Sequence, residues 1–373
     1  MSLDTHTKLL LVLSLFCFNV VFAGESGARS ADLGMEGFEQ HGRGLGLSHY
    51  KGRSSHLFNV KSFGARADGL TDDSKAFRAA WKKACQATGE VDLVIPRGTY
   101  LVGPVKFAGP CTNVSKITVR VKGYLKATTN LSKYGHSAGW VEFKWVEGLI
   151  LTGGGTFDGQ GAKAWPYNRC PTDFNCKLLP TNVKFVGTNR TVVRSITSVN
   201  SKFFHMALVE CKNFKGSKIK ISAPADSPNT DGIHIERSSS VHFSRSLIGT
   251  GDDCISIGQG NSQVTITSIS CGPGHGIRYS FNFLITCCCT LFLLSLTIGT
   301  SQVKLSDIYF KKIKGTSSSA VAVTLECSKG IPCQDIYLED VHLDLASGEK
   351  QATSTCKNVR AKYIGTQIPP PCA

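Results

Sequence analysis

The sequence predicts an all-β solenoid, in which coils of short strands stack on one another. Three short motifs recur at one spacing: Asn-Thr-Asp-Gly at 229–232, Gly-Asp-Asp-Cys at 251–254 and Gly-His-Gly at 274–276. Asp231 and Asp253 are 22 residues apart, and so are Asp253 and His275. A repeat of this length is typical of solenoids, whose coils bury their apolar faces only against neighbouring coils. We therefore expect the three motifs to lie on one face of the stack.

Pairs of apolar residues keep step with these motifs. One predicted column of buried strand residues consists of Ile219/Ile221, Val241/Phe243 and Val264/Ile266, and a second consists of Ile233/Ile235 and Ile255/Ile257. Within each pair the apolar residues alternate with another residue, which indicates a strand that buries every second side chain.

The N-terminal residues are expected to lie outside the solenoid. Residues 1–23 have the pattern of a secretory signal, with Lys8 before an apolar run and a small-residue cleavage site at 21–23. Residues 24–56 are rich in Gly, Ser, Arg and His and show no apolar period, which predicts a flexible leader. We assign residues 57–373 to one solenoid domain.

One amphipathic helix is expected ahead of the strands. Thr-Asp-Asp-Ser at 71–74 supplies an N-cap, and the apolar residues that follow fall on one stripe: Ala76, Phe77, Ala80, Trp81 and Ala84. Such a helix would cover the open end of the solenoid, where backbone groups are otherwise unpaired. From residue 91 to 276, short β-branched strands alternate with turns, so there is no βαβ alternation.

Composition and cysteine content favour an oxidising compartment and an acidic partner. The formal net charge is +15, and of the 15 cysteines only Cys17 lies in the signal segment. Pairs close enough in sequence to form small disulfide loops are Cys170/Cys176, Cys254/Cys271, Cys327/Cys333 and Cys356/Cys372. Glycosylation sequons begin at Asn113, Asn130 and Asn189. A basic secreted protein favours polyanions such as acidic polysaccharide, and the dispersed Lys and Arg residues do not form a nucleic-acid module.

The motifs place three carboxylates and a histidine on one wall. Adjacent parallel strands lie about 4.8 Å apart, so Asp231 and Asp253 should be neighbours, with Asp252 beside them. Like charges this close raise the pKa of one carboxyl. Glycosidic hydrolysis needs this asymmetry, because one carboxyl protonates the leaving oxygen while another attacks or activates water. Each motif alone is typical of a turn or a solvated loop, but together and at one-coil spacing they predict a site. Other candidates are interpreted as structural: Asp72 and Asp73 at the helix start, Asp158 in a turn and His242 in a strand.

The chain resembles plant polygalacturonases of glycoside hydrolase family 28, most of all the pollen-type exopolygalacturonases, in segments 58–60, 63–65, 68–69, 71–73, 229–234, 251–257 and 271–277. The resemblance implies a right-handed parallel β-helix that hydrolyses the α-1,4-galacturonan of pectin with inversion, outside the cell, as a monomer without a cofactor. It implies that Asp252 donates the proton, while Asp231 and Asp253 position and deprotonate the water. His275 would tune Asp252 or bind the sugar, and Asn229 would bind substrate or close a turn.

The family pattern breaks at residues 278–300. The family continues with further coils and an Arg-x-Lys pair that holds the substrate carboxylate, whereas this chain has a mostly apolar run, Tyr279 to Gly299. The run has the length of a membrane helix, but a spanning helix would separate coils that should stack. The Arg-x-Lys sequences at 120–122 and 360–362 are not carried over. We therefore expect several coils to be missing, with strand edges left open and low solubility and activity. Two alternatives stay open: a pectin-binding pseudoenzyme, and a pectate lyase, which would need Ca²⁺ and a basic catalytic residue.

Overall fold

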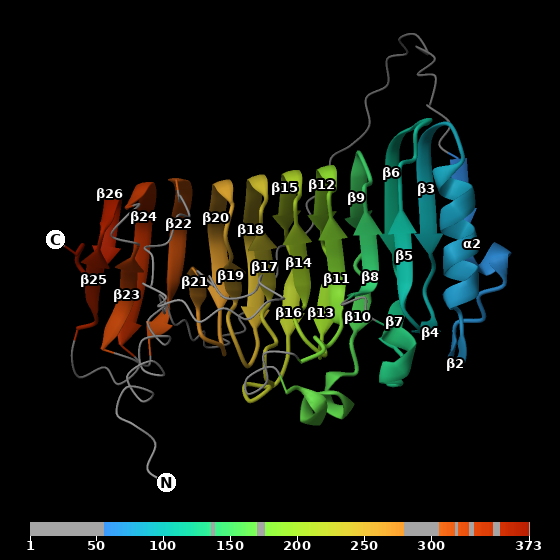
Figure 1. The fold of residues 1–373 in the computed structure, drawn as a ribbon, viewed down its shortest axis with the longest axis horizontal. Helices are drawn as coiled ribbons and strands as arrows, with labels where there is room; N and C mark the ends of the chain where they lie inside the picture. Colours follow the sequence, from blue (N-terminus) through green and yellow to red (C-terminus); the bar gives the residue numbers. More distant parts are fainter. Residues whose placement is uncertain are drawn as a thin grey trace, which may run out of the picture.

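The computed structural model describes residues 56–135, 139–169, 176–279, 306–317, 320–327, 332–345 and 351–372. It confirms the predicted all-β parallel β-helix, with α2 covering one end (Figure 1). The signal segment, the leader up to residue 55, and residues 280–305 lie outside the described residues. Within the described part, no helix is long and apolar enough to cross a membrane.

Three ladders of parallel strands form the walls of the solenoid. One 17-stranded sheet contains the first two ladders. The first ladder runs through β1 (His56–Asn59), β3 (Gly89–Ile95), β6 (Val114–Val121), β9 (Leu149–Thr152), β12 (Asn189–Arg194), β15 (Lys212–Ser217), β18 (Ser239–Gly249), β20 (Ser262–Cys271), β22 (Ser306–Ser317), β24 (Cys333–Leu345) and β26 (Val359–Ile368). The second runs through β2 (Asp68–Asp72), β4 (Thr99–Val102), β7 (Tyr124–Ala127), β10 (Thr156–Asp158), β13 (Thr197–Val199) and β16 (Lys220–Ser222), and joins the C-terminal half of β18.

The third wall is a separate 7-stranded sheet, and it leads to the predicted site. It consists of β5 (Val105–Ala108), β8 (Gly139–Lys144), β11 (Thr181–Val186), β14 (Met206–Val209), β17 (Ile233–Glu236), β19 (Ile255–Ile257) and β21 (Ile277–Tyr279). A 2-stranded sheet of β23 (Val321–Glu326) and β25 (Thr353–Lys357) follows in the C-terminal part. Short 3-10 helices are η1 (Val60–Phe63), η2 (Leu131–Tyr134), η3 (Gly161–Lys163) and η4 (Trp165–Tyr167).

The end helix is α2 (Ser74–Cys85), and its five predicted apolar residues are all buried. It packs against β1, β3 and β5. Asp73 occupies the N-cap position, but its side chain accepts hydrogen bonds from the backbone of Arg66 and Ala67 instead of capping the helix. Asp72 accepts a hydrogen bond from the backbone N–H of Ser74 at 3.0 Å. Asp72 therefore stabilises the helix start, as predicted, whereas the Asp73 side chain holds the backbone at residues 66 and 67.

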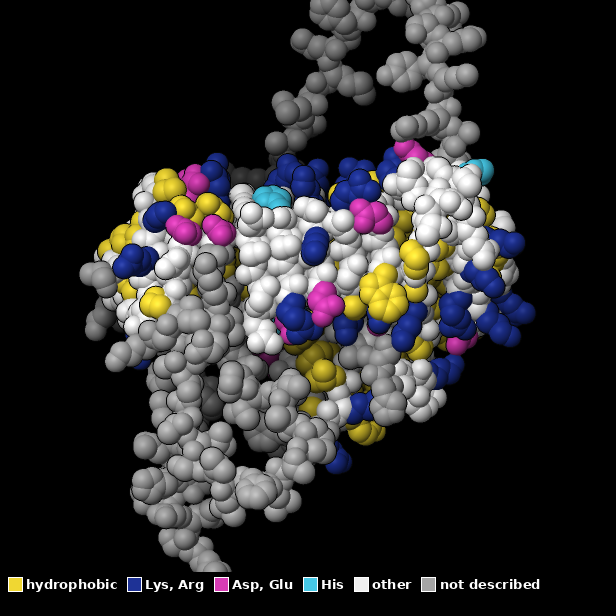
Figure 2. All heavy atoms as spheres, turned by 45° about the horizontal axis from the view of Figure 1, so that its top comes forward, with side chains coloured by type: hydrophobic (Ala, Val, Ile, Leu, Met, Phe, Trp, Pro, Cys, Tyr) yellow, Lys and Arg dark blue, Asp and Glu magenta, His cyan; other side chains and the backbone are white. Residues whose placement is uncertain are grey.

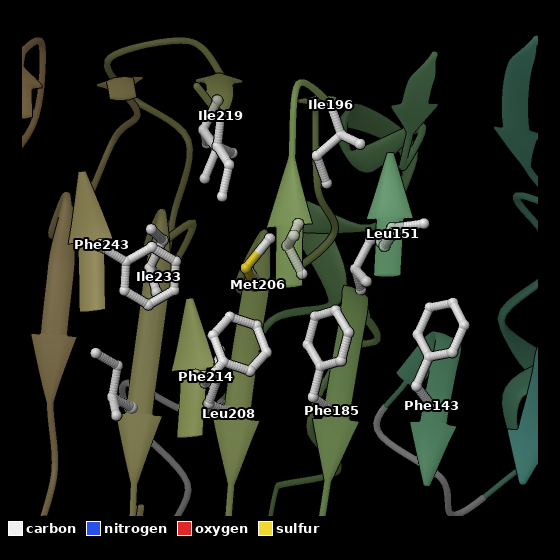
Figure 3. Packing of buried hydrophobic residues seen from close by; sticks show 14 of the residues in the cluster. Phe143, Leu151, Phe185, Ile196, Met206, Leu208, Phe214, Ile219, Ile233 and Phe243 are labelled. Carbon is white, nitrogen blue, oxygen red and sulfur yellow. The ribbon is translucent and has the colours of Figure 1, made fainter. Parts of the chain in front are cut away.

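The core between the walls is filled by columns of apolar side chains. The rings of Phe143, Phe185, Phe214 and Phe243 follow one another from coil to coil, with centroids 5.0 to 5.7 Å apart (Figure 3). This spacing is typical of favourable aromatic pairs. Each ring is supplied by a different strand, so no coil fills its share of the interior alone.

The predicted apolar columns are confirmed with one correction. Val241/Phe243 pairs with Val264/Ile266, and Ile233/Ile235 pairs with Ile255/Ile257. Ile221, however, lies opposite Ile248, and the partner of Val241 in the preceding coil is Phe214. The error has a physical reason, because β18 is long enough to pair with β15 through its first half and with β16 through its second. Asp158 is a second correction, because it ends β10 and is buried, with Tyr124 donating to it at 2.7 Å, rather than lying in a turn. His242 lies on β18, in a strand as predicted.

Three of the predicted disulfides form: Cys254–Cys271, Cys327–Cys333 and Cys356–Cys372. A fourth, Cys85–Cys111, was not predicted, because 26 residues separate its cysteines. It joins the end of α2 to the loop after β5. Cys170, of the predicted pair Cys170/Cys176, lies outside the described residues.

Candidate active site

Each predicted site residue lies just before a strand of the third wall. Asp231 precedes β17, Asp253 precedes β19 and His275 precedes β21. Backbone hydrogen bonds hold these three loops in register, from Gly232 N–H to the Asp253 carbonyl at 2.8 Å and from His275 N–H to the Asp252 carbonyl at 2.9 Å. The 22-residue spacing therefore stacks the three motifs coil on coil, as predicted from the sequence.

Glycines allow these loops to approach closely. A Cβ at Gly251 would lie 2.2 Å from the carbonyl oxygen of Ser227 on the preceding coil. A Cβ at Gly274 would lie 2.7 Å from the Asp252 carbonyl, and its φ of +146° is in the region that favours glycine. The glycines of the motifs thus set how near the coils that carry the acids can pack.

The acids and the histidine converge at one place. One ligating atom from each of Asp252, Asp253 and His275 lies within 4.8 Å of the other two. Asp252 accepts hydrogen bonds from the Asp253 backbone N–H at 2.8 Å and lies 3.2 Å from His275 Nδ1. Asn229 Nδ2 donates to its other oxygen at 3.5 Å, from a residue with a left-handed φ of 49°.

The three carboxyl groups have different environments. Burial, and next the negative charge of Asp252, raise the pKa of Asp231 to about 6. Burial, and next the charge of Asp231, raise the pKa of Asp253 to about 9, although the Arg278 guanidinium opposes the shift. Burial acts to raise the pKa of Asp252 too, but the hydrogen bond and positive charge of His275 outweigh it and lower that pKa. The predicted asymmetry is present, with the raised pKa values on Asp231 and Asp253.

His275 is the residue that makes the pKa of Asp252 differ from those of Asp231 and Asp253. The hydrogen bond to Asp252 raises the pKa of His275, against burial. In the free site, the proton of this pair therefore resides on the imidazole. The imidazole is within hydrogen-bonding distance of Asp252 Oδ1 and can transfer its proton to that carboxylate, which can transfer a proton onward.

Arg278 is a residue that the sequence reasoning missed. It lies on β21 opposite Ser256, and its Nε is 3.2 Å from Asp253 Oδ2 without hydrogen-bond geometry. Its side chain is 35% exposed, against 3% for Asp253, so the guanidinium faces both the acids and solvent. One sequence signal could have identified Arg278. It lies two residues after the Gly-His-Gly motif, and alternate side chains of a strand point to the same face. Ser256 and His234 were missed as well, and lie in the same outward column as Arg278.

These side chains can move protons and hold an anion. Asp252, Asp253 and His275 are also residue types that could hold a metal ion. The Asp252 oxygens are already engaged by His275, Asn229 and a backbone N–H, and Arg278 adds a positive charge, so the donor set fits a cation poorly.

Comparisons with known proteins cover most of the chain. The model of glycosyl hydrolases family 28 matches residues 85–279 and 295–365, and the gap between the two ranges falls within the predicted break. An exopolygalacturonase of Zea mays is 35% identical over 97% of this chain and 97% of its own, and one of Platanus acerifolia is 37% identical over 85% and 97%. A polygalacturonase of Gossypium barbadense is 37% identical over 84% and 90%.

Solved structures share the fold at low identity. The exopolygalacturonase of Thermotoga maritima has a TM-score of 0.57 and 18% identity, over 84% of this chain and 92% of its own. The endo-xylogalacturonan hydrolase of Aspergillus tubingensis has a TM-score of 0.57 and 17% identity, over 83% and 100%. These likenesses confirm the right-handed parallel β-helix.

Proposed function

Since the chain belongs to glycosyl hydrolase family 28, we propose that it is a secreted, exo-acting hydrolase of α-1,4-galacturonan that works with inversion. The observation that carries the proposal is the convergence of Asp252, Asp253 and His275, with Asp231 on the coil stacked beside Asp253. Hydrolysis of a glycosidic bond needs one acid and one base with different pKa values. Relatives named exopolygalacturonase support the exo mode, and the disulfides support a secreted protein.

Asp252 is assigned as the proton donor to the glycosidic oxygen. Without substrate the pKa of Asp252 is lowered, so the transferable proton is on His275, whose Nδ1 lies 3.2 Å from Asp252 Oδ1. As the leaving oxygen gains negative charge, His275 passes its proton to Asp252, and Asp252 passes one to the oxygen. The imidazole and the carboxyl thus act as one acid, which explains why a histidine lies one coil beyond the carboxylates.

Asp231 is assigned as the base, and Asp253 as the group that holds the water. With a pKa of about 6, Asp231 is ionised at neutral pH and is more basic than an ordinary aspartate. Asp253, with a pKa of about 9, stays protonated there and can orient the water by hydrogen bonding. The two buried carboxyl groups therefore divide the work of positioning and deprotonating the nucleophile.

Arg278 is assigned to the uronate carboxylate of the substrate. An arginine binds a carboxylate through charge-assisted hydrogen bonds, and this one lies beside the acids with its tip partly exposed. It takes the place of the Arg-x-Lys pair that the family pattern leads one to expect. The +15 charge assists the approach of a polyanion, with Lys and Arg spread over the visible face and interspersed with acids (Figure 2).

The test is a product analysis on polygalacturonate with the chain lacking residues 1–23. Release of reducing ends without ultraviolet absorbance from unsaturated sugars supports hydrolysis, and early accumulation of monogalacturonate supports exo action. Unsaturated products would make the protein a lyase. Binding of polygalacturonate without any release of reducing ends would make it a pectin-binding pseudoenzyme.

A further inference from the structure

A short arm of the chain lies between β10 and β11 and ends close to the acids. It comprises residues 161–168, with η3 and η4, and projects from the solenoid below β13 (Figure 1). Asn168, its last residue, donates a hydrogen bond from Nδ2 to Asn229 Oδ1 at 2.7 Å. Asn229 Nδ2 in turn lies 3.5 Å from Asp252 Oδ2. The roles proposed above use neither the arm nor Asn168.

We propose that Asn168 is a positioning residue for the acid Asp252, which it orients through the side-chain amide of Asn229. This role rests on the proposed function, because it matters to turnover only if Asp252 protonates the leaving oxygen. Asn168 acts from outside the group of acids, since its bond is to Asn229.

The arm is anchored on the loop that precedes β14. Trp165 Nε1 donates to the Ser201 carbonyl at 3.0 Å, and the Gly161 N–H donates to the Asn200 carbonyl at 2.8 Å. The Asn168 N–H donates to the Trp165 carbonyl at 3.0 Å, which fixes the end of the arm to its middle. A small buried apolar cluster joins the arm to the same loop: Ala164, Leu179 and Phe203. Asn168 is therefore held in a defined place.

The arm brings together residues of two coils that are not neighbours. It precedes β11, whereas Asn229 lies in the loop before β17, and β14 lies between these two strands in the third wall. Adjacent strands lie about 4.8 Å apart, so the arm spans the loop before β14 to reach Asn229. Strand pairing connects only neighbouring coils. The contact between Asn168 and Asn229 therefore depends on the arm.

The charge of Asp252 fixes the direction of both amides. His275 lowers the pKa of Asp252 despite its burial, so the carboxylate only accepts hydrogen bonds. Asn229 must therefore present its N–H2 group to Asp252 and its carbonyl oxygen to Asn168. Asn168 must present its own N–H2 group to that oxygen, and this is the arrangement in the structure.

The shorter of the two bonds holds the Asn229 amide in place. The 2.7 Å bond from Asn168 is at the short end of the normal range, whereas 3.5 Å is long for a hydrogen bond. On its other oxygen, Asp252 accepts from the Asp253 N–H and faces His275 Nδ1 at 3.2 Å. With the Asn229 amide fixed at Oδ2, the carboxyl group is held from both sides in one orientation.

The experiment compares Asn168→Ala, which removes the donor, with Asn168→Asp, which keeps the shape but replaces the donor by an acceptor. Asn168→Ala should lower kcat on polygalacturonate about three- to tenfold, with KM unchanged. Asn168→Asp should lower kcat further, because the new carboxylate attracts the N–H2 group of Asn229 and turns its carbonyl oxygen toward Asp252. A side chain that only filled space would give the opposite order.

The loss in Asn168→Asp should depend on pH. A protonated carboxyl group can donate to Asn229 Oδ1, as Asn168 does. Since an ordinary aspartate has a pKa of about 3.9, the kcat of this variant relative to the parent should recover as pH falls toward 4. Asn168→Ala introduces no titratable group and should show no such recovery.

Asn213 supplies a matched control away from the acids. Its Nδ2 donates to Asn189 Oδ1 at 3.0 Å, in an exposed pair of asparagines on β15 and β12. Asn213→Ala and Asn213→Asp make the same chemical changes as the two variants of Asn168. Both should leave kcat and its pH dependence as in the parent.

A second measurement does not depend on activity. Carbon-13 NMR of aspartate labelled at the side-chain carboxyl follows the titration of Asp252, whose signal is assigned by its loss in Asp252→Asn. Four other charged groups around Asp252 are the same in all variants: Asp231, Asp253, His275 and Arg278. Because a donor to the carboxylate stabilises its ionised form, Asn168→Ala should raise the pKa of Asp252, and Asn168→Asp should raise it more.

Three results would overturn the proposal: a parental kcat in Asn168→Ala, a loss in Asn168→Asp no larger than in Asn168→Ala, or an unchanged titration of Asp252 in both variants. If the parent releases no reducing ends, the proposed function fails, while the titration still decides whether Asn168 orients Asp252 through Asn229.

Discussion

The coils from β1 to β21 and the strands from β22 to β26 share one ladder but differ in their third wall. β20 pairs with β22 in parallel, Val264 opposite Ile308, so the first ladder continues across the break in the family pattern. The expectation of open strand edges there is wrong for this ladder. The wall that carries the acids, however, ends at β21 within the described residues. A continuous ladder therefore preserves the fold, but a site also needs the wall from which its side chains project.

The two parts also use their cations differently. Lys362, of the C-terminal Arg-x-Lys sequence, lies 2.9 Å from Asp335 Oδ1 and over the Tyr337 ring, in a surface pair between neighbouring strands. Arg278 instead lies beside three crowded carboxyl groups. We therefore expect the charges around a cation, rather than its motif, to decide whether it binds substrate.

The largest effect is expected at Asp252. Asp252→Asn keeps the side-chain shape but removes the transferable proton, so turnover should fall by about 10² to 10⁴-fold. Pectin binding and the unfolding midpoint should change little. Asp226→Asn, an exposed acid on the preceding loop, is the control and should keep full activity. Normal turnover in Asp252→Asn would remove the assignment of the acid.

The disulfides compare the two parts directly, because Cys254–Cys271 and Cys356–Cys372 close loops of 17 and 16 residues. Replacing either pair by alanine should lower the free energy of unfolding by about 3 kcal/mol, since loops of similar length restrict the unfolded chain similarly. Only the first replacement should also lower kcat, because Cys254 adjoins Asp253. Denaturant unfolding and reducing-sugar assays on both variants measure this. Equal loss of activity in the two would show that the site does not depend locally on its coil.

Arg278 and Arg360 test which cation binds the substrate. Arg278→Gln should weaken binding of oligogalacturonate by about 1.5 to 3 kcal/mol, the value typical of a hydrogen bond to a charged group, and should have less effect on the methyl ester. Arg360→Gln should change neither. Calorimetric binding with both ligands distinguishes the two residues, and a loss confined to Arg360→Gln would reverse the assignment.

Another comparison uses the pH dependence of stability that originates in the acid-bearing coils. The folded pKa values of Asp231 and Asp253, about 6 and about 9, exceed the unfolded value of about 3.9. Between pH 4 and 9 these two carboxyl groups therefore hold more protons in the folded protein than in the unfolded chain, so their contribution to stability falls as pH rises. Asp253→Asn should flatten this fall and raise the unfolding temperature at pH 8.

Asp72 is the control with the opposite sign. Burial acts to raise its pKa, but Ser74 and Lys133 lower it to about 2. Its contribution to stability is present above the unfolded pKa and is lost as pH falls toward 2, so Asp72→Asn should lower the unfolding temperature at pH 8. The unfolding temperatures of both variants are measured between pH 4 and 9. If Asp253→Asn and Asp72→Asn change the unfolding temperature at pH 8 in the same direction, the pKa shifts do not explain the pH dependence.

The sequence by itself determined the coil, the end helix and which acidic residues share one wall. A 22-residue period can be read along the chain, because strands of successive coils repeat both their apolar alternation and their motifs. The stripe from Ala76 to Ala84 likewise specifies α2, since a helical period is a local property. The 22-residue period also places five site residues on one wall from the sequence alone: Asp231, Asp252, Asp253, His275 and Asn229.

Only the tertiary structure decided which side chains complete the site. Arg278, Ser256 and His234 form a column across β21, β19 and β17, and a contact between strands depends on register, which no single strand encodes. The pKa order was also settled by packing, because burial raises the pKa of Asp231 and Asp253 while His275 lowers that of Asp252. Spacing along the chain decides which residues share a wall. Burial and neighbouring charges in the folded wall then decide the pKa of each carboxyl group.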